Sequence, residues 1–127
     1  MAQAPADIQR QINRLIADTL AAVVAGSAEP ELRAMGQRLA HSSGAAVLPG
    51  LGRHVAADAA AMINGSGGTF LEMDEGNRFS RGHPAVHVIP AALALSQERK
   101  ATAESFLAAI VVGYEVGSRL GAASLLR

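Results

Sequence analysis

The hydrophobic positions in the first 40 residues follow the spacing of helices. Apolar side chains recur every three to five residues before Gly26, which is suited to end a helix. A second, shorter helix is expected after Pro30, because proline is favoured in a first helical turn and Ser-Ser-Gly follows at residues 42–44. The two apolar faces consist of Ile8, Ile12, Leu15, Ile16, Leu20 and Val23 in the first helix and Leu32, Met35 and Leu39 in the second.

The centre of the chain is punctuated by glycine and proline. Residues 45–52 contain one proline and two glycines, which favours a short strand or a loop over a helix. The alanine-rich residues 53–64 predict a third helix, which Asn64 and Gly65 would end. Residues 65–82 then hold five glycines and most of the local charge, so we expect a Gly-rich acidic loop that carries the chemistry.

Two further helices are expected after this loop. Pro84 is suited to open the fourth helix, and Arg99 lies near its end. Pro90, inside this helix, should kink it or delay its true start. A fifth helix is expected from about residue 103 to residue 123. The pattern predicts an all-α fold, a bundle of about five helices that forms a single domain over residues 1–127.

Three glycines of the fifth helix are spaced by four residues and therefore share one face. Glycine inside a helix costs about 0.5–1 kcal/mol relative to alanine, so such a face is expected to have a packing partner. A tightly packed helix pair within the chain is the preferred interpretation, and an interface between subunits is the alternative. The glycines are Gly113, Gly117 and Gly121.

Composition supports a helical core of small side chains. The 127 residues are 50% hydrophobic but only 3% aromatic, which favours helices over the β-branched and aromatic strands of a sandwich or barrel. Eleven basic and eleven acidic residues cancel, so nucleic acid and anionic membrane are not expected as partners. The chain has no cysteine, which excludes disulfides and thiolate metal sites and favours a cytoplasmic location.

The most hydrophobic run, residues 106–114, is expected to be a buried helix. It lies between Glu104 and Glu115 and falls short of the roughly 20 residues that span a bilayer. The first apolar stretch, residues 8–24, is interrupted by charged side chains and therefore lacks the hydrophobic region of a signal peptide.

Residues 72–84 concentrate the groups that could carry chemistry. They hold three carboxylates, two guanidinium groups and one imidazole between two hydrophobic helices. His83 directly precedes Pro84 and so is expected at the helix cap, where the peptide dipoles place a partial positive charge. That charge disfavours the imidazolium form, whereas a nearby carboxylate would favour it, and the sequence leaves the balance open.

His87 follows His83 by four residues, which is also the spacing of a two-histidine metal site. Glu72 or Asp74 could supply a third ligand. No glutamate follows the first histidine, however, and Pro84 weakens the helix geometry on which that motif depends. A packed or capping role for His87 is therefore preferred, a substrate-facing His87 is the alternative, and no metal is expected.

Six blocks of sequence, in order over about residues 12–123, resemble the MmgE/PrpD family, whose members include 2-methylcitrate dehydratase and cis-aconitate decarboxylase. Any one block is weak evidence, but the six in order are specific. The blocks are Asp18–Leu20 with Gly26, Ala60–Gly65, Glu72–Glu75, His83-Pro84, Ile89–Ala94, and Val112–Val116 with Arg119–Gly121.

The resemblance implies a lyase that acts without a metal or organic cofactor, forms dimers, and combines a large helical domain with a smaller lid domain. Carried over by position, His83 resembles the catalytic histidine, and Glu72 and Asp74 resemble acidic residues of the pocket. The chain departs from the family pattern, which commonly has aspartate at 72 and 75 and a histidine near Thr69. It also has an extra residue before His83, and relatives run several times further.

The expected function is that of a truncated lyase domain, inactive as an isolated chain, for a di- or tricarboxylic acid such as 2-methylcitrate. His83 could take either proton-transfer role and Asp74 could be its partner, while Arg78 and Arg81 could bind substrate carboxylates and Glu72 could line the pocket. The alternative is a non-catalytic helical module that self-associates through its glycine face. A homodimer is expected in either case, because a domain of this length would leave apolar surface exposed.

Overall fold

A computed structural model describes residues 5–124, and this part of the chain folds into five helices and two short strands. The all-α class predicted from the hydrophobic pattern is confirmed, with one small hairpin added. The elements are α1 (Ala6–Gly26), α2 (Pro30–Leu39), β1 (Ala46–Leu48), β2 (Arg53–Val55), α3 (Ala57–Phe70), α4 (Pro84–Arg99) and α5 (Ala103–Ala123).

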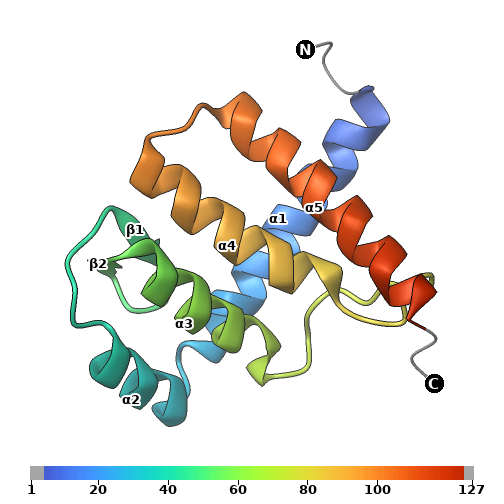
Figure 1. Ribbon diagram of the computed structural model, residues 1–127. Coiled ribbons are helices and arrows are strands. Elements are labelled where there is room, and N and C mark those ends of the chain that lie inside the picture. The colour runs from blue at the N-terminus through green and yellow to red at the C-terminus, as the bar shows by residue number, and fades with distance from the viewer. Residues whose placement is uncertain (1–4, 125–127) are drawn as a thin grey trace.

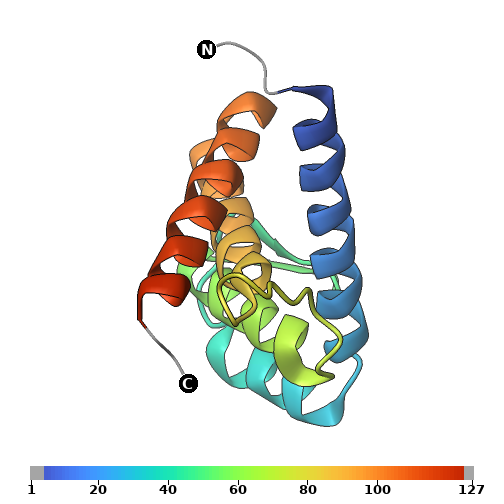
Figure 2. The ribbon, with the colours of Figure 1, turned by 90° about the vertical axis from the view of Figure 1, so that its right-hand side faces the viewer.

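Three helices lie side by side, with α4 between α3 and α5 (Figure 1). The long helix α1 crosses behind them and contacts α3 most extensively. Seen after a 90° turn, α1 forms a separate layer on one side of α4 and α5 (Figure 2). The loop of residues 71–83 joins the end of α3 to the start of α4 and passes beside the C-terminal half of α5.

The predicted third helix was wrong at both of its ends. Residues 53–55 form β2, which pairs antiparallel with β1 so that Ala46 lies opposite Val55. Helix α3 then continues past Asn64 and through three glycines to Phe70. Glycine is a poor helix former, but here it allows α1 and α3 to approach closely. A Cβ atom on Gly26 would lie only 2.0 Å from the carbonyl oxygen of Gly67.

The core has two parts that share α4. One part lies between the hairpin, α3 and α4, and the other lies between α1, α4 and α5. Two side chains fix the hairpin to the helices at a single residue: the Asn64 amide donates to the Val47 carbonyl at 2.9 Å, and the Val47 N–H donates to Gln97 Oε1 at 2.9 Å. The second part, which lies next to the loop of residues 71–83, contains Ile12, Ala85, Ile89 and Ile110.

Helix α4 begins at Pro84, as predicted, and runs through Pro90 to Arg99. The start is therefore not delayed by the internal proline, which is buried in the helix packing. Helix α5 begins at the expected place, because the hydroxyl of Thr102 accepts a hydrogen bond from the Ser105 N–H at 3.2 Å. This is the usual cap for the unpaired amides of a first turn.

The glycine face of α5 contacts the protein's own chain. A Cβ on Gly113 would lie 2.7 Å from the Val88 side chain, and one on Gly121 would lie 2.5 Å from the carbonyl oxygen of Ser80. The preferred interpretation, a close contact within the chain, is confirmed. Self-association through Gly113, Gly117 and Gly121 stays a prediction, although α4 and the loop already contact this face.

The expectation that the hydrophobic run in α5 would be buried was wrong. Only Ile110 and Ser118 of this helix are buried. Its outward face exposes three large apolar side chains, Val112 at 63%, Val116 at 50% and Leu120 at 65%. Among the residues that the structure describes, α5 is the one helix that is long and apolar enough to cross a membrane, judged by length and composition alone.

Candidate active site

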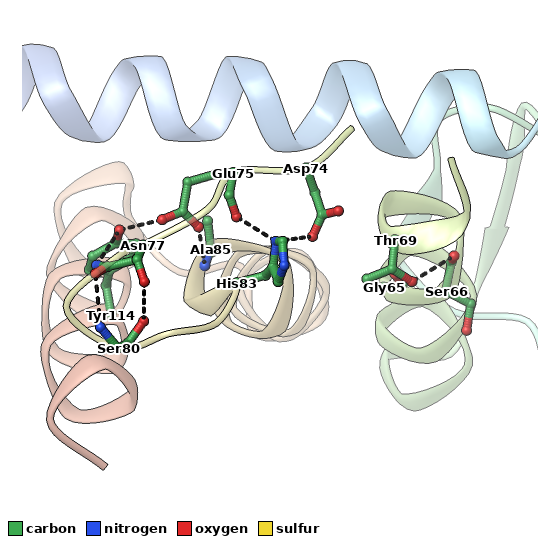
Figure 3. Close-up of polar contacts among 10 residues, drawn as sticks. All are labelled: Gly65, Ser66, Thr69, Asp74, Glu75, Asn77, Ser80, His83, Ala85 and Tyr114. Atoms are coloured by element: carbon green, nitrogen blue, oxygen red, sulfur yellow. Dashed lines mark hydrogen bonds and ion pairs between the residues drawn. The ribbon is translucent and has the colours of Figure 1, made fainter. Parts of the chain in front are cut away.

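His83 occupies the cap position of α4 and turns its ring toward the acidic loop (Figure 3). Its Nδ1 atom lies 2.9 Å from the backbone carbonyl oxygen of Glu75 and 3.3 Å from Oδ2 of Asp74. The imidazole is 54% exposed, whereas the Asp74 side chain is 4% exposed. The structure therefore brings a reachable imidazole and a buried carboxylate together at the mouth of a helix.

The neighbours of Nδ1 determine which ring nitrogen carries the hydrogen of the neutral imidazole. A backbone carbonyl oxygen only accepts hydrogen bonds, so Nδ1 must carry a hydrogen to bond with Glu75. The other ring nitrogen, Nε2, is then the one with a lone pair in the neutral form and can take up a proton.

The Asp74 carboxylate is placed to stabilise a charged His83 ring. Its Oδ2 atom is buried and makes no hydrogen bond within residues 5–124, which leaves a negative charge beside the ring. The two side chains therefore form an ion pair whenever the ring carries a proton on both nitrogens.

Glu75 points the opposite way along the loop and fixes it to two helices (Figure 3). Its Oε2 atom accepts a hydrogen bond from the Ala85 N–H at 3.1 Å, which satisfies one of the unpaired amides at the start of α4. Its Oε1 atom accepts a hydrogen bond from the Tyr114 hydroxyl of α5 at 2.5 Å. His83 was predicted at this helix cap from the sequence, but no role was assigned to Glu75.

Tyr114 is a neutral donor in this network. Burial and the hydrogen bond to Glu75 raise the pKa of Tyr114 to about 12. Asn77 completes the connection to α5, because its side-chain amide donates to the Tyr114 oxygen at 3.0 Å. The Asn77 Oδ1 atom in turn accepts from the backbone amides of Phe79 and Ser80, which holds the turn of the loop.

Comparison with known proteins identifies the family to which this site belongs. A family model described as the MmgE/PrpD N-terminal domain matches residues 1–127. The chain belongs to the MmgE/PrpD family. It is also 31% identical, over 128 aligned positions, to the cis-aconitate decarboxylase-like protein oryM of Aspergillus oryzae. That match covers 94% of the chain but only 27% of the relative, so the chain spans about a quarter of its length. No solved structure matches the chain.

The structure pairs two of the five residues that the MmgE/PrpD resemblance and the local chemistry had indicated. These two are His83 and Asp74. The other three, Glu72, Arg78 and Arg81, are exposed on the same loop. Glu72 and Arg81 adopt left-handed backbone conformations, with φ of 54° and 53°, which bend the loop on either side of its acidic and asparagine residues.

Thr69 stands near the place where MmgE/PrpD proteins commonly have a histidine. It is exposed in the last turn of α3, and its hydroxyl donates back to the Ser66 carbonyl at 3.2 Å (Figure 3). The hydroxyl hydrogen of Thr69 is therefore used within α3. A threonine side chain also does not titrate, so Thr69 cannot replace the histidine that the family commonly has.

His87 is exposed one turn into α4, and His83 holds the cap position, so the preferred packed or capping role was wrong. Within residues 5–124, no group of three or more histidine, cysteine, aspartate or glutamate side chains is arranged to hold a metal ion. A groove of about 220 Å³ does exist, between α1 and α5, but its lining is mostly apolar. It meets the site only at Tyr114, and its other lining residues are Ile8, Gln11, Ile12, Leu15, Ile110, Val111 and Glu115.

Proposed function

We propose that this MmgE/PrpD chain forms one wall of a lyase site for a di- or tricarboxylic acid, in which His83 moves a proton. The observation that carries the proposal is the position of the imidazole. Its Nδ1 faces two acceptor oxygens at the start of α4, which leaves Nε2 available for a substrate.

The chemistry expected of such a site is elimination next to a carboxylate. In a dehydration, Nε2 of His83 takes the proton from the carbon α to a carboxylate, and the electrons of that C–H bond form the carbon–carbon double bond. The hydroxyl leaves the β carbon and takes up a proton to become water. Once Nε2 has taken the proton, the His83 ring is positively charged. Asp74 stabilises this charge and so lowers the free energy of the state in which the ring is protonated.

The exposed charges of the loop suit a polycarboxylate. Arg78 and Arg81 are exposed on the loop between Asp74 and His83, and a guanidinium group can bind a carboxylate through two parallel hydrogen bonds. Glu72, on the same loop, would limit how many carboxylates can approach by repelling them. The balance of these charges would determine which acid is accepted.

The name of the Aspergillus relative supports the substrate class, because cis-aconitate, like 2-methylcitrate, is a tricarboxylic acid. The imidazole is half exposed, and a lyase site has to exclude water and to supply an acid as well as a base. We therefore propose that residues 1–127 bind the substrate in the cytoplasm but need groups from outside these residues for turnover.

The proposal is tested by titrating the chain with 2-methylcitrate and with cis-aconitate while the four histidines are followed by proton NMR. Signals of His83 should shift with the concentration of the acid, and those of His54 should not. Replacement of Arg81 by Gln should weaken binding at least severalfold, because one bidentate charged contact is lost. The matched control is Arg53→Gln on β2, which should leave the affinity unchanged.

Absence of any shift at His83 with millimolar tricarboxylate would contradict the binding proposal. Turnover is measured in the same samples by the appearance of product. Dehydration of 2-methylcitrate by the purified chain, abolished by His83→Ala, would instead show that no further residues are needed.

A second candidate function is self-association, which is favoured by the outward face of α5. Val112, Val116 and Leu120 follow each other by four residues and are all at least half exposed. The chain has no formal net charge, so charge repulsion does not oppose contact between two copies. We propose that the chain forms a homodimer through this face and not through the glycine face.

A further inference from the structure

We propose that Tyr114 and Glu75 are positioning residues that hold the proton of the neutral His83 ring on Nδ1. The inference rests on the proposed function only in taking His83 as the proton-transfer group. The positioning itself follows from contacts that the structure describes.

The Glu75 side chain and its two hydrogen bonds, from Tyr114 and from Ala85, form a clamp. One carboxylate oxygen accepts from the Tyr114 hydroxyl and the other from the Ala85 N–H, so the side chain is held by α5 and α4 at once. These contacts join residues 39 and 10 positions apart in the sequence. A side chain fixed at both oxygens leaves its own backbone little freedom to rotate.

The same backbone supplies the acceptor for the imidazole. The Glu75 carbonyl oxygen lies 2.9 Å from His83 Nδ1, and His83 is only two residues before Ala85 on the cap of α4. The donor, His83, and the acceptor, the Glu75 carbonyl, are therefore both held in place at the first turn of α4. If the Glu75 side chain were released, the carbonyl would lose this fixed position relative to the ring.

The need for a clamp follows from the loop and from the chemistry of imidazole. Apart from one antiparallel bridge between Asn77 and Gly82, residues 71–83 form no helix or strand, and Glu75 lies outside that bridge. An exposed hydrogen bond alone contributes little against the freedom of such a backbone. A free histidine side chain favours the other tautomer, with the hydrogen on Nε2. That tautomer has no lone pair on the nitrogen that must accept the substrate proton.

Asn77 strengthens the clamp from the side of α5. Its amide donates to the Tyr114 oxygen, so the hydroxyl hydrogen of Tyr114 is directed to Glu75. The raised pKa of Tyr114 is in keeping with this, since it means that the hydroxyl stays protonated throughout the neutral range.

The test is the tautomer of His83, read from the two ring nitrogens by ¹⁵N NMR above the pKa of the ring. The wild-type chain should show a hydrogen on Nδ1 in most molecules. Tyr114→Phe keeps the ring but removes the donor, and Glu75→Gln leaves only one oxygen to accept from two donors. In both variants the fraction with hydrogen on Nε2 should rise severalfold.

Glu115→Gln is the matched control, because it also removes one carboxylate but from an exposed pair with Arg119. It should leave the tautomer unchanged. Thermal melts of all four proteins establish that they are folded at the temperature of the measurement.

A wild-type ring with its hydrogen on Nε2, or an unchanged tautomer in both folded variants, would overturn the positioning proposal. The outcome is independent of substrate. If the tautomer responds as expected but no tricarboxylate binds, the lyase proposal fails and the clamp stands. If tricarboxylate binds to His83 but the tautomer does not respond, the clamp fails alone.

Discussion

At the scale of single residues, the Tyr114 side chain joins α5 to the loop residue that contacts His83. Tyr114 donates to Glu75 and accepts from Asn77, and Glu75 is the residue whose carbonyl contacts His83. Ionised Tyr114 could not donate this hydrogen bond and would place a second negative charge beside Glu75. The folded protein therefore favours the neutral phenol.

This residue gives a direct prediction for alkaline solution. The folded pKa of Tyr114, about 12, is above the unfolded value near 10, so the folded state holds the proton more tightly. The resulting stabilisation is fully present below pH 10 and is lost as the pH rises from 10 to 12. Tyr114 is the only tyrosine and the chain has no tryptophan, so ultraviolet absorbance follows this group alone.

The titration should have its midpoint well above that of the chain unfolded in denaturant. Glu75→Gln should lower the folded midpoint, because one cause of the raised pKa is the hydrogen bond to Glu75. A wild-type midpoint at the ordinary value of about 10 would contradict the proposed network.

At the scale of elements, glycine controls how closely the helices pack. Gly26 at the end of α1 lies against the backbone of Gly67 in α3, and there is no room for a side chain at the contact. Gly65, two residues before Gly67 in α3, has space: its Cβ would lie 3.9 Å from the Val86 carbonyl oxygen. Gly26 and Gly65 therefore have different roles in the packing.

Replacing these glycines by alanine should change stability in opposite directions. Gly26→Ala should lower the free energy of unfolding by about 1–3 kcal/mol or more, because the methyl group meets a backbone oxygen that cannot move aside. Gly65→Ala, the matched control, should raise it by about 0.5–1 kcal/mol through helix propensity. Urea unfolding followed by circular dichroism measures both. Equal effects of the two substitutions would show that the contact between α1 and α3 is looser than described.

At the scale of the whole molecule, the long α5 is packed on one side only. Its glycine face contacts α4 and the loop, whereas the adjoining face, about 100° around the helix, exposes valine and leucine side chains to solvent. Exposed apolar surface of this kind usually marks a contact with another chain or domain. The MmgE/PrpD relative is nearly four times longer than the part that the chain matches, so additional sequence is available in that protein to cover this face.

The isolated chain should therefore self-associate through α5 as its concentration rises. Val116→Lys should weaken the association at least tenfold, since burial of a valine side chain contributes about 1.5–3 kcal/mol and a lysine cannot replace it. Met62→Lys is the control, because Met62 is 57% exposed on α3, outside the proposed face. Analytical ultracentrifugation over a range of concentrations measures the effect. A wild-type chain that stays monomeric at all concentrations would exclude this face as a self-association surface.

The sequence predicted the helices whose limits are fixed locally. Thr102 and Pro84 begin α5 and α4 by capping and by the preferred position of proline, both of which depend on neighbouring residues. It failed for α3, where Asn64-Gly65 was expected to stop the helix. There, contact with α1 outweighs the low helix propensity of three glycines, and such a contact is invisible in the local pattern.

The candidate site, too, was predicted where its features lie close together in the sequence and missed where they depend on distant residues. His83 was predicted at a helix cap beside an acidic loop, because both features are contained within thirteen residues. Glu75 was not singled out among its acidic neighbours, since its partner Tyr114 is 39 residues away on another helix. Asp74 was expected as the partner of His83, but its contact with Nδ1 depends on how the loop folds back onto the start of α4, which the local sequence does not determine.

Local sequence thus determined where the helices begin, which family the chain resembles, and which short segment holds the titratable groups. Only the tertiary structure decided which carboxylate faces the imidazole, which side of α5 is covered, and where α3 ends. The physical reason is that caps, turns and helical periodicity act over a few residues. Helix packing and hydrogen bonds such as Tyr114–Glu75, in contrast, depend on the relative placement of segments that are far apart in the chain.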